Sequence, residues 1–487
     1  MSTEIELKLQ VSAAAIRQLL AHPLLTSTPP QKQHLLNTYF DTQKLELHAR
    51  RVAVRFRKKG WQWLRTVKSA EPASGGLAMR SEWETPATPG IFDFSHVDAD
   101  DFRQFLEQKQ PQLEPVFTTD FHRQIWHLPF GESLIELAID RGHIEACGRR
   151  EKISEIELEL LSGNVDDIFG LTRELQQKID LRPAVASKAE RGYKLFLNEP
   201  LRPFKSKAVP IKEQQTPVAA FRSVALGCLE HFQRNESGLS QGNDPEFIHQ
   251  ARVSLRRLRS AIKLFAPVLP TEFVAAYGQT WRTLAGALGD TRNWDVFLEE
   301  TLPPIAAAFP EHRDIKRLHK AAQRRAHSAR KSVIGLLAIS EYPRLMLEFT
   351  AAIYTLNDSA PIPIKDFAQQ QIASYARKAR KLALRHAELT PEERHKMRIA
   401  FKKLRYSLEF FAPLLPPRRL KPYLAALSQL QDELGLINDH VTAETLITEA
   451  LDGHPAGPVH GWIVGRHALL ISEVPEVLQT WLAQTAP

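Results

Sequence analysis

The chain has 487 residues and a formal net charge of +8, and 43% of its residues are hydrophobic. This length predicts about two to four domains with buried cores, and the composition excludes a disordered chain. Cys147 and Cys228 form no CxxC pair, so we expect neither a thiolate metal site nor a disulfide framework, and a reducing, cytoplasmic location. Because no run of 18 apolar residues occurs and no signal-peptide pattern is found, we expect no membrane segment.

The charge is unevenly distributed along the chain. Residues 1–200 hold 26 Lys and Arg against 28 Asp and Glu, a net of −2, whereas the remainder carries +10. A basic C-terminal part indicates an anionic partner, and nucleic acid, a membrane surface and a phosphate polymer all fit that description. The sign of the charge does not choose among them.

The first ten residues alternate charged and aliphatic side chains, and the charged ones are Glu4, Glu6 and Lys8. This pattern predicts a strand with one apolar and one charged face. A solvated face is the simplest interpretation, but a second acidic strand follows at 153–161, with Glu155, Glu157 and Glu159 on one face. Two acidic faces in one small domain repel each other unless cations lie between them, so the pair indicates a metal site.

The segments between these two strands follow the same alternation. We expect strands at 35–42, 51–59, 61–68, 78–85, 118–128, 133–140 and 142–150, and helices at 13–21, 99–109, 165–179 and 187–197. The strands would form a largely antiparallel sheet with charges of both signs on one face; a sheet with one solvated face is the alternative. The concentration of charge favours a closed tunnel that holds a metal–polyanion complex.

A set of motifs occurs in a fixed order along residues 1–197. They are EIELK at 4–8, Arg55-x-Arg57, TVK at 66–68, RSEWE at 80–84, Arg123, ELAIDRG at 136–142, EIELEL at 155–160 and SKAERGY at 187–193. The first matches an ExExK signature, and the ordered set resembles the CYTH superfamily, also called triphosphate tunnel metalloenzymes. The resemblance implies an antiparallel β-tunnel that binds triphosphate with Mg²⁺ or Mn²⁺.

The resemblance also implies roles for individual residues. Phosphate contacts would come from Lys8, Arg55, Arg57, Lys68, Arg123 and Lys188, with Arg80 and Arg191 as further substrate contacts. Metal ions would be held by Glu4, Glu6, Asp140, Glu157 and Glu159. Glu155 shares their strand face, so which of Glu155, Glu157 and Glu159 reach a metal stays open. Glu82, Glu84 and Glu136 would complete the lining, and catalysis would depend on Glu4, Glu6, Lys8, Arg55, Arg57 and Lys68.

Residues 199–217 contain four prolines and little apolar periodicity, which predicts a linker between domains at 1–198 and 218–487. Beyond it the pattern becomes helical, with Pro-rich turns. HQARVSLRRLR at 249–259 and HKMRIAFKKLR at 395–405 repeat at an offset of 146 residues, so we expect two helical repeats, at about 218–355 and 362–480, related by a pseudo-twofold axis.

Each repeat places basic residues on one helix face, next to an apolar row that we assign to the core. The face holds His249, Arg252, Arg256, Arg259 and Lys263 in the first copy and the matching His395, Arg398, Lys402 and Arg405 in the second. We count the neighbouring Arg257 and Lys403 among the candidate binding residues as well. A solvated face usually mixes charge signs, so the repetition favours a binding surface. The arrangement resembles the CHAD domain, an α-helical bundle domain associated with inorganic polyphosphate.

The order of the two domains resembles bacterial inorganic triphosphatases. We therefore expect an α+β tunnel domain that hydrolyses inorganic triphosphate to pyrophosphate and phosphate with a divalent metal, followed by an all-α domain that binds long-chain polyphosphate. The alternatives are hydrolysis of an organic triphosphate (ATP or thiamine triphosphate) and a non-catalytic protein of polyphosphate granules. Nucleic acid ranks low because the basic stripes lack interleaved aromatics. The physiological substrate, preferred metal, polyphosphate length and oligomeric state stay open.

Overall fold

The computed structural model describes residues 2–70, 76–242, 244–358, 362–454 and 457–486. The chain forms two compact units. The first comprises Met1–Leu201 and Ile339–Thr355, and the second comprises Arg202–Ala338 and Leu356–Pro487. The first unit thus includes one segment, 339–355, that the sequence pattern had placed in the helical repeat. Among the helices of the described ranges, none combines the length and apolar character needed to cross a bilayer.

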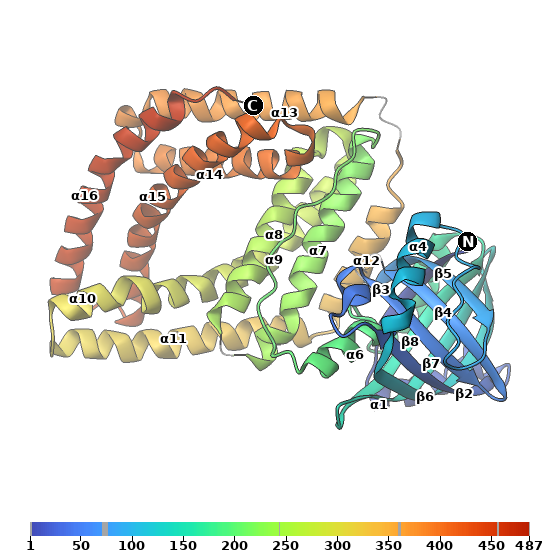
Figure 1. The fold of residues 1–487 in the computed structure, drawn as a ribbon. Coiled ribbons are helices and arrows are strands. Elements are labelled where there is room, and N and C mark those ends of the chain that lie inside the picture. The colour runs from blue at the N-terminus through green and yellow to red at the C-terminus, as the bar shows by residue number, and fades with distance from the viewer. Residues whose placement is uncertain (1, 71–75, 243, 359–361, 455–456, 487) are drawn as a thin grey trace. The chain divides into compact units, whose positions relative to one another are not determined.

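An antiparallel sheet dominates the first unit (Figure 1). Its described strands, in sheet order, are β5 (Leu77–Pro86), β4 (Gln62–Ala70), β3 (Val52–Lys59), β2 (Gln31–Asp41), β6 (Glu114–Phe130), β7 (Ser133–Ala146), β8 (Arg149–Ser162), β1 (Ser2–Gln10) and β9 (Arg182–Pro183). β1 pairs with β8, where Glu6 lies opposite Glu159, and also with β5, where Glu6 lies opposite Ala78. The second pairing closes the sheet into a tunnel, as the sequence predicted.

Helices surround this tunnel, except that the start of α6 contributes Lys188 to its interior. They are α1 (Ala13–Leu20), α2 (Pro23–Thr26), α3 (Glu46–Ala49), α4 (Asp100–Lys109), α5 (Val165–Gln176), α6 (Lys188–Leu197) and α12 (Glu341–Tyr354). The aliphatic row of β1 faces them: Leu7 and Leu9 are fully buried in one core with Ile16 of α1 and Ile168 of α5. Because side chains alternate along a strand, the charged row of β1 must then face the interior of the tunnel.

Helix α12 packs with this unit although it lies far along the chain. Leu347 belongs to the same apolar core as Leu7 and Ile168, and Ala351 and Tyr354 pack against it. The Tyr354 and Phe169 rings stack with centroids 6.4 Å apart, and Arg344 donates a hydrogen bond of 2.8 Å to the carbonyl of Gln176. The helix therefore completes the core around α5, and this long-range contact has no local signal in the sequence.

One predicted strand boundary is wrong. The sequence pattern split 133–150 into two strands at Arg141, whereas β7 continues through Gly142 to Ala146. Gly142 is required by packing: a Cβ atom there would lie 2.1 Å from the carbonyl oxygen of Asp120 on β6. The actual turn is at Cys147 and Gly148, whose φ angles of 49° and 73° are left-handed.

The second unit is helical. Its described helices are α7 (Pro217–Gln241), α8 (Pro245–Leu264), α9 (Thr271–Val296), α10 (Leu302–Ala308), α11 (Arg313–Ala338), α13 (Ile364–Leu384), α14 (Pro391–Phe410), α15 (Pro417–Ala450) and α16 (Gly457–Leu482), with a π-helix at Phe297–Thr301. Both ends of α8 and α14, and the starts of α9 and α15, differ by the offset of 146 residues seen in the sequence. The helix boundaries thus repeat with the sequence.

Candidate active site and cationic cluster

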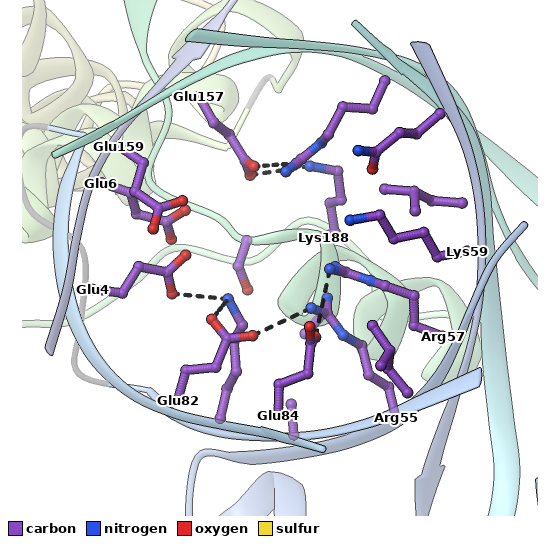
Figure 2. A pocket seen from close by; sticks show the side chains of 18 of the residues that line it. Glu4, Glu6, Arg55, Arg57, Lys59, Glu82, Glu84, Glu157, Glu159 and Lys188 are labelled. Atoms are coloured by element: carbon purple, nitrogen blue, oxygen red, sulfur yellow. Dashed lines mark hydrogen bonds and ion pairs between the residues drawn. The ribbon is translucent and has the colours of Figure 1, made fainter. Parts of the chain in front are cut away.

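The interior of the tunnel is a cavity of about 890 Å³ whose walls carry opposite charges. Figure 2 shows Glu4, Glu6 and Glu159 gathered on one wall, with Arg55, Arg57 and Lys59 on the opposite wall. The strand pleat explains the placement, because inward positions recur every second residue along β1, β3 and β8. The cavity could therefore bind a cation at its acidic wall and an anion at its cationic wall.

The acidic wall has few compensating cations. Lys68 Nζ lies 2.8 Å from a carboxylate oxygen of Glu4, and Lys8 Nζ lies 3.1 Å from one of Glu6. Burial, together with the nearby carboxylates of Glu4 and Glu136, raises the pKa of Glu159 to about 7. A carboxyl group with such a pKa lies where negative charge exceeds positive charge, which is the condition that favours binding of a hard cation.

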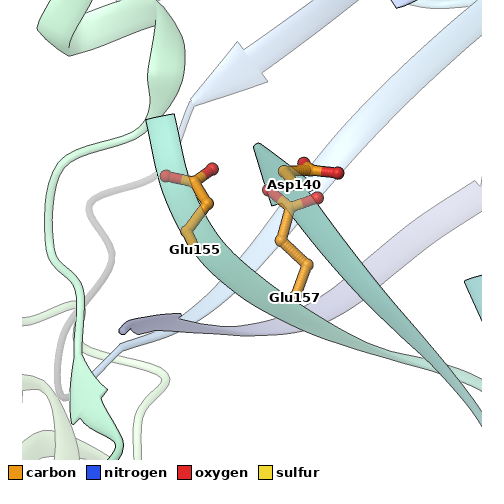
Figure 3. Close-up of side chains that lie close together, drawn as sticks. All are labelled: Asp140, Glu155 and Glu157. Carbon is orange, nitrogen blue, oxygen red and sulfur yellow. The ribbon is translucent and has the colours of Figure 1, made fainter. Parts of the chain in front are cut away.

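A second acidic group, formed by Asp140, Glu155 and Glu157, lies on the neighbouring strands β7 and β8 (Figure 3). One oxygen of each of these three buried carboxylates lies within 4.8 Å of the others. Unlike the first group, it is already compensated: Lys188 ion-pairs with all three, and Arg123 donates hydrogen bonds of 2.8 and 2.7 Å to Asp140.

The pKa values follow this pairing. Burial alone would raise the pKa of Glu157, but Lys188, Lys8 and Arg123 hold it well below its usual range. In the same way, Arg123 and Lys188 lower the pKa of Asp140 against the effect of burial. Asp140 and Glu157 therefore stay ionised, and the protein's own lysine and arginine side chains neutralise their charge.

The cationic wall is held by looser contacts. A guanidinium nitrogen of Arg55 lies 3.6 Å from Glu82, and one of Arg57 lies 3.7 Å from Glu84. Burial and the neighbouring charges of Arg55 and Arg123 lower the pKa of Arg57 to about 10, so the group remains charged at neutral pH. Positive charge is therefore crowded on this wall and incompletely balanced.

Sequence reasoning missed several residues of the cavity. Tyr39 lines it, and its hydroxyl accepts a 3.2 Å hydrogen bond from Arg55. Asn37 accepts a 2.8 Å hydrogen bond from Arg57 Nε, and Lys59 lies on the exposed rim. Tyr39 and Asn37 occupy alternate positions of β2, so the strand period that identified the charged residues could also have found them.

Most of the predicted tunnel residues line one cavity. These are Glu4, Glu6, Lys8, Arg55, Arg57, Lys68, Glu82, Glu84, Arg123, Glu136, Glu157, Glu159 and Lys188. Asp140 and Glu155 contact Lys188 instead of the cavity surface, and Arg191 pairs with Glu151 at 2.6 Å and Glu155 at 3.0 Å. The side chain of Arg80 lies outside the described residues.

In the second unit, basic side chains of α8 and α14 form a cluster that we call the cationic cluster, consisting of Arg252, Arg256, Arg398 and Lys402. The Nε atoms of its three arginines are buried and have no hydrogen-bond partner among the described residues. Burial and these three arginines lower the pKa of Lys402 to about 6. Such a concentration of unbalanced positive charge is costly without an anion, which makes it a candidate anion site.

The two copies of the basic stripe differ at one end. The position that matches Lys263 in the second copy is Glu409, whose carboxylate lies 2.5 Å from Arg257 and 2.7 Å from Arg405. The charges of Arg257 and Arg405 are thus neutralised by a carboxylate of the protein itself. His395 and Lys263 are exposed, and burial together with Arg292 lowers the pKa of His249.

The basic surface extends beyond the predicted residues. Burial and the charges of Arg259 and Arg282 lower the pKa of Lys263, and burial and the charges of Lys263 and Lys378 lower that of Lys403. Arg282 on α9 and Lys378 on α13 therefore belong to the same basic surface. They lie outside the repeated motif, so the repeat gave no reason to include them.

Comparison with known proteins agrees with the two-unit architecture. The family model described as "CYTH domain" matches residues 2–193, and the one described as "CHAD domain" matches residues 223–448. An inorganic triphosphatase of Haemophilus influenzae is 35% identical over 202 residues, which make up 40% of this chain and 55% of that protein. The match thus spans about half the length of this curated relative.

A solved structure resembles the second half of the chain. The crystal structure of the CHAD domain from the plant Ricinus communis is 32% identical, with a TM-score of 0.52, and the similarity covers 59% of this chain and 98% of that one.

Proposed function

Because the chain belongs to the CYTH and CHAD domain families, we propose that its first unit is a divalent-metal-dependent hydrolase that splits inorganic triphosphate into pyrophosphate and phosphate. The observation that carries the proposal is the tunnel with acidic and cationic walls facing each other across one cavity. A pure anion site needs no clustered carboxylates, whereas a site for a metal–triphosphate complex needs both walls. The similarity to an inorganic triphosphatase supports this choice of substrate.

The triphosphate would lie against the cationic wall. Arg55 and Arg57 would bind its oxygens, since guanidinium groups match phosphate geometry and their present contacts to Glu82 and Glu84 are long. Lys68 would add an ammonium group, which pairs with Glu4 and Glu82 at 2.8 Å in the structure. The same charges would stabilise the negative charge that develops on the departing pyrophosphate. Lys8, Arg123 and Lys188 also line the cavity, and their charge adds to the field although each is bound to a carboxylate.

The acidic wall fits a divalent cation. Glu4, Glu6 and Glu159 would hold it, because their carboxylates are crowded enough to raise the pKa of Glu159 to about 7 through burial and mutual repulsion. Asp140, Glu155 and Glu157 fit less well, since Lys188 already balances them. When bound, Mg²⁺ or Mn²⁺ would supply positive charge to the phosphate oxygens and lower the pKa of the attacking water.

The test is phosphate release from triphosphate, pyrophosphate, ATP, thiamine triphosphate and long polyphosphate, with Mg²⁺ or Mn²⁺ and with excess EDTA. We expect triphosphate to be preferred and EDTA to abolish turnover reversibly. Glu6→Gln should lower activity by orders of magnitude, whereas Glu145→Gln, on the outer face of β7, should not. Full activity in EDTA would rule out metal dependence, and a preference for ATP or thiamine triphosphate would favour an organic substrate.

We further propose that the second unit binds long-chain polyphosphate through the cationic cluster, and that this binding brings the protein to polyphosphate granules. Support comes from the buried arginine Nε atoms without partners in the described chain and from the CHAD family match. Binding should weaken steeply with salt, because each neutralised phosphate releases counterions, as in DNA binding.

Paired variants test the cluster. Arg398→Gln should weaken polyphosphate binding, whereas Arg405→Gln, whose side chain is occupied by Glu409, should leave the affinity nearly unchanged. Equal effects of the two variants in a filter-binding or calorimetric assay would show that the cluster is not the binding site.

A further inference from the structure

We infer that Lys402 takes up a proton when the cationic cluster binds a polyanion, so that polyphosphate binding is coupled to protonation of this one side chain. The inference rests on the proposed polyphosphate site and specifies how that site is regulated. It also assigns a distinct role to the single lysine in a cluster whose other three members are arginines.

The geometry supplies the reason. Lys402 on α14 lies one helical turn after Arg398 and one turn before Tyr406, so the three side chains share one helix face. Arg252 and Arg256 from α8 and Arg398 repel its charge, and Asp439 of α15 attracts it. Arg256 also lies over the Tyr406 ring, with its guanidinium carbon 5.5 Å from the ring centroid, and Arg398 donates a 3.0 Å hydrogen bond to Asn438. The lysine is thus surrounded by cations on two helices.

The position is also asymmetric between the repeats. The residue that matches Lys402 in the first copy is Arg256, 146 positions earlier. An arginine stays protonated in such surroundings, because its intrinsic pKa is above 12, whereas a lysine can lose its proton. Burial, followed by repulsion from Arg398, Arg256 and Arg252, lowers the pKa of Lys402 to about 6, so the free protein holds it mainly neutral at pH 7.5.

A bound polyphosphate reverses this balance. Its oxygens offset the charge of the three arginines, and the amine then returns towards its ordinary pKa of about 10.4. Binding at pH 7.5 should therefore be accompanied by uptake of about one proton per cluster. The affinity should be highest near pH 6 and should fall by up to about tenfold per pH unit above it, because each unit makes the proton tenfold scarcer.

The experiment is calorimetric titration of the full chain with long-chain sodium polyphosphate at pH 7.5, in EDTA to prevent hydrolysis. Repeating it in buffers of different ionisation enthalpy gives the number of protons exchanged. We expect about one more proton for the wild type than for Lys402→Arg, whose guanidinium is already charged. Lys316→Arg, at an exposed lysine of α11 that pairs with Glu311 outside the basic surface, is the matched control and should keep the wild-type uptake.

A second variant tests the same inference without introducing an arginine at position 402. Lys402→Gln cannot be charged, so it should lose the extra proton uptake and bind more weakly than Lys402→Arg at pH 7.5. Equal proton uptake by the wild type and Lys402→Arg, with binding retained, would overturn the inference and leave the proposed polyphosphate site intact. Failure of the wild-type chain to bind polyphosphate at any pH from 6 to 8 would overturn both.

Discussion

The stability of the tunnel unit should depend on helix α12. This helix follows α7 to α11 of the second unit in the sequence but belongs to the first unit. A fragment of residues 2–201 keeps every strand of the sheet and loses this helix. It exposes the pocket of Leu347, a side chain that is 2% exposed in the whole chain. It also loses the Tyr354–Phe169 contact and the hydrogen bond from Arg344 to Gln176.

These losses can be given rough magnitudes. Full burial of a leucine contributes about 1.5–3 kcal/mol. An aromatic pair adds about 0.5–1.5 kcal/mol, and a hydrogen bond about the same. Together they amount to roughly 3–6 kcal/mol, against about 5–15 kcal/mol for the free energy of unfolding of a typical domain. The fragment should unfold on the order of 10–20 °C below the tunnel unit of the whole chain.

Differential scanning calorimetry of the whole chain and the fragment tests this expectation. Leu347→Ala in the whole chain should cost about 2–5 kcal/mol. Leu161→Ala, at a residue that is 44% exposed on β8, should cost much less. If the fragment melts at the same temperature as the tunnel unit of the whole chain, or if the two alanine variants are equally stable, α12 is not part of this core and the reasoning fails.

Three further predictions follow from the tunnel. Arg57→Ala and Lys68→Ala should raise KM and lower kcat in steady-state assays, and a change in KM alone would mean that both residues bind substrate and transition state equally. Without divalent metal, the thermal midpoint should fall as pH rises from about 5 to about 7, because the folded state, with the pKa of Glu159 raised to about 7, binds more protons than the unfolded state in that window. Glu159→Gln should remove this dependence of the thermal midpoint on pH. If the dependence is unchanged in the variant, another titrating group causes it. Gly142→Ala should destabilise the chain by about 1–3 kcal/mol or more in urea unfolding, since its Cβ would lie 2.1 Å from the Asp120 carbonyl, whereas Gly278→Ala, with open space around it, should not.

The alternating pattern predicted the charged face of the sheet and most of the residues on it, and the resemblance to the CYTH superfamily implied that the sheet closes into a tunnel. A strand fixes the face of each residue locally, so Glu4, Glu6 and Glu159 could be placed on inward positions without knowing the pairing of the strands. Strand ends were harder. The expected strands ended at 140 and began again at Gly142, whereas β7 runs through both positions and Gly142 admits the backbone of β6.

The sequence could not reveal which charges are already paired. Arg257 and Arg405 belong to the same repeated motifs as the cationic cluster, and only the fold brings Glu409 against both. Asp140 and Glu155 share strand faces with the cavity residues, and only the fold places Lys188 among them. Such contacts join residues far apart in the chain, so local periodicity carries no information about them.

The ion pairs of the tunnel also indicate which contacts can give way to substrate. Lys188 and Arg123 contact Asp140 at 2.6 and 2.7 Å, and Asp140 is fully buried. Withdrawing either cation would remove one of the two counter-charges of this buried carboxylate, and loss of a partner from a buried ion pair is costly. On the opposite wall the Arg55–Glu82 and Arg57–Glu84 pairs are 3.6 and 3.7 Å apart, beyond hydrogen-bond length, and both carboxylates are partly exposed. Under the proposed function, phosphate oxygens would replace Glu82 beside Arg55 and Glu84 beside Arg57, while Lys68 stays 2.8 Å from Glu82 and compensates that carboxylate. We therefore expect the contacts of Lys188 to stay in place and those of Arg55 and Arg57 to exchange when triphosphate binds.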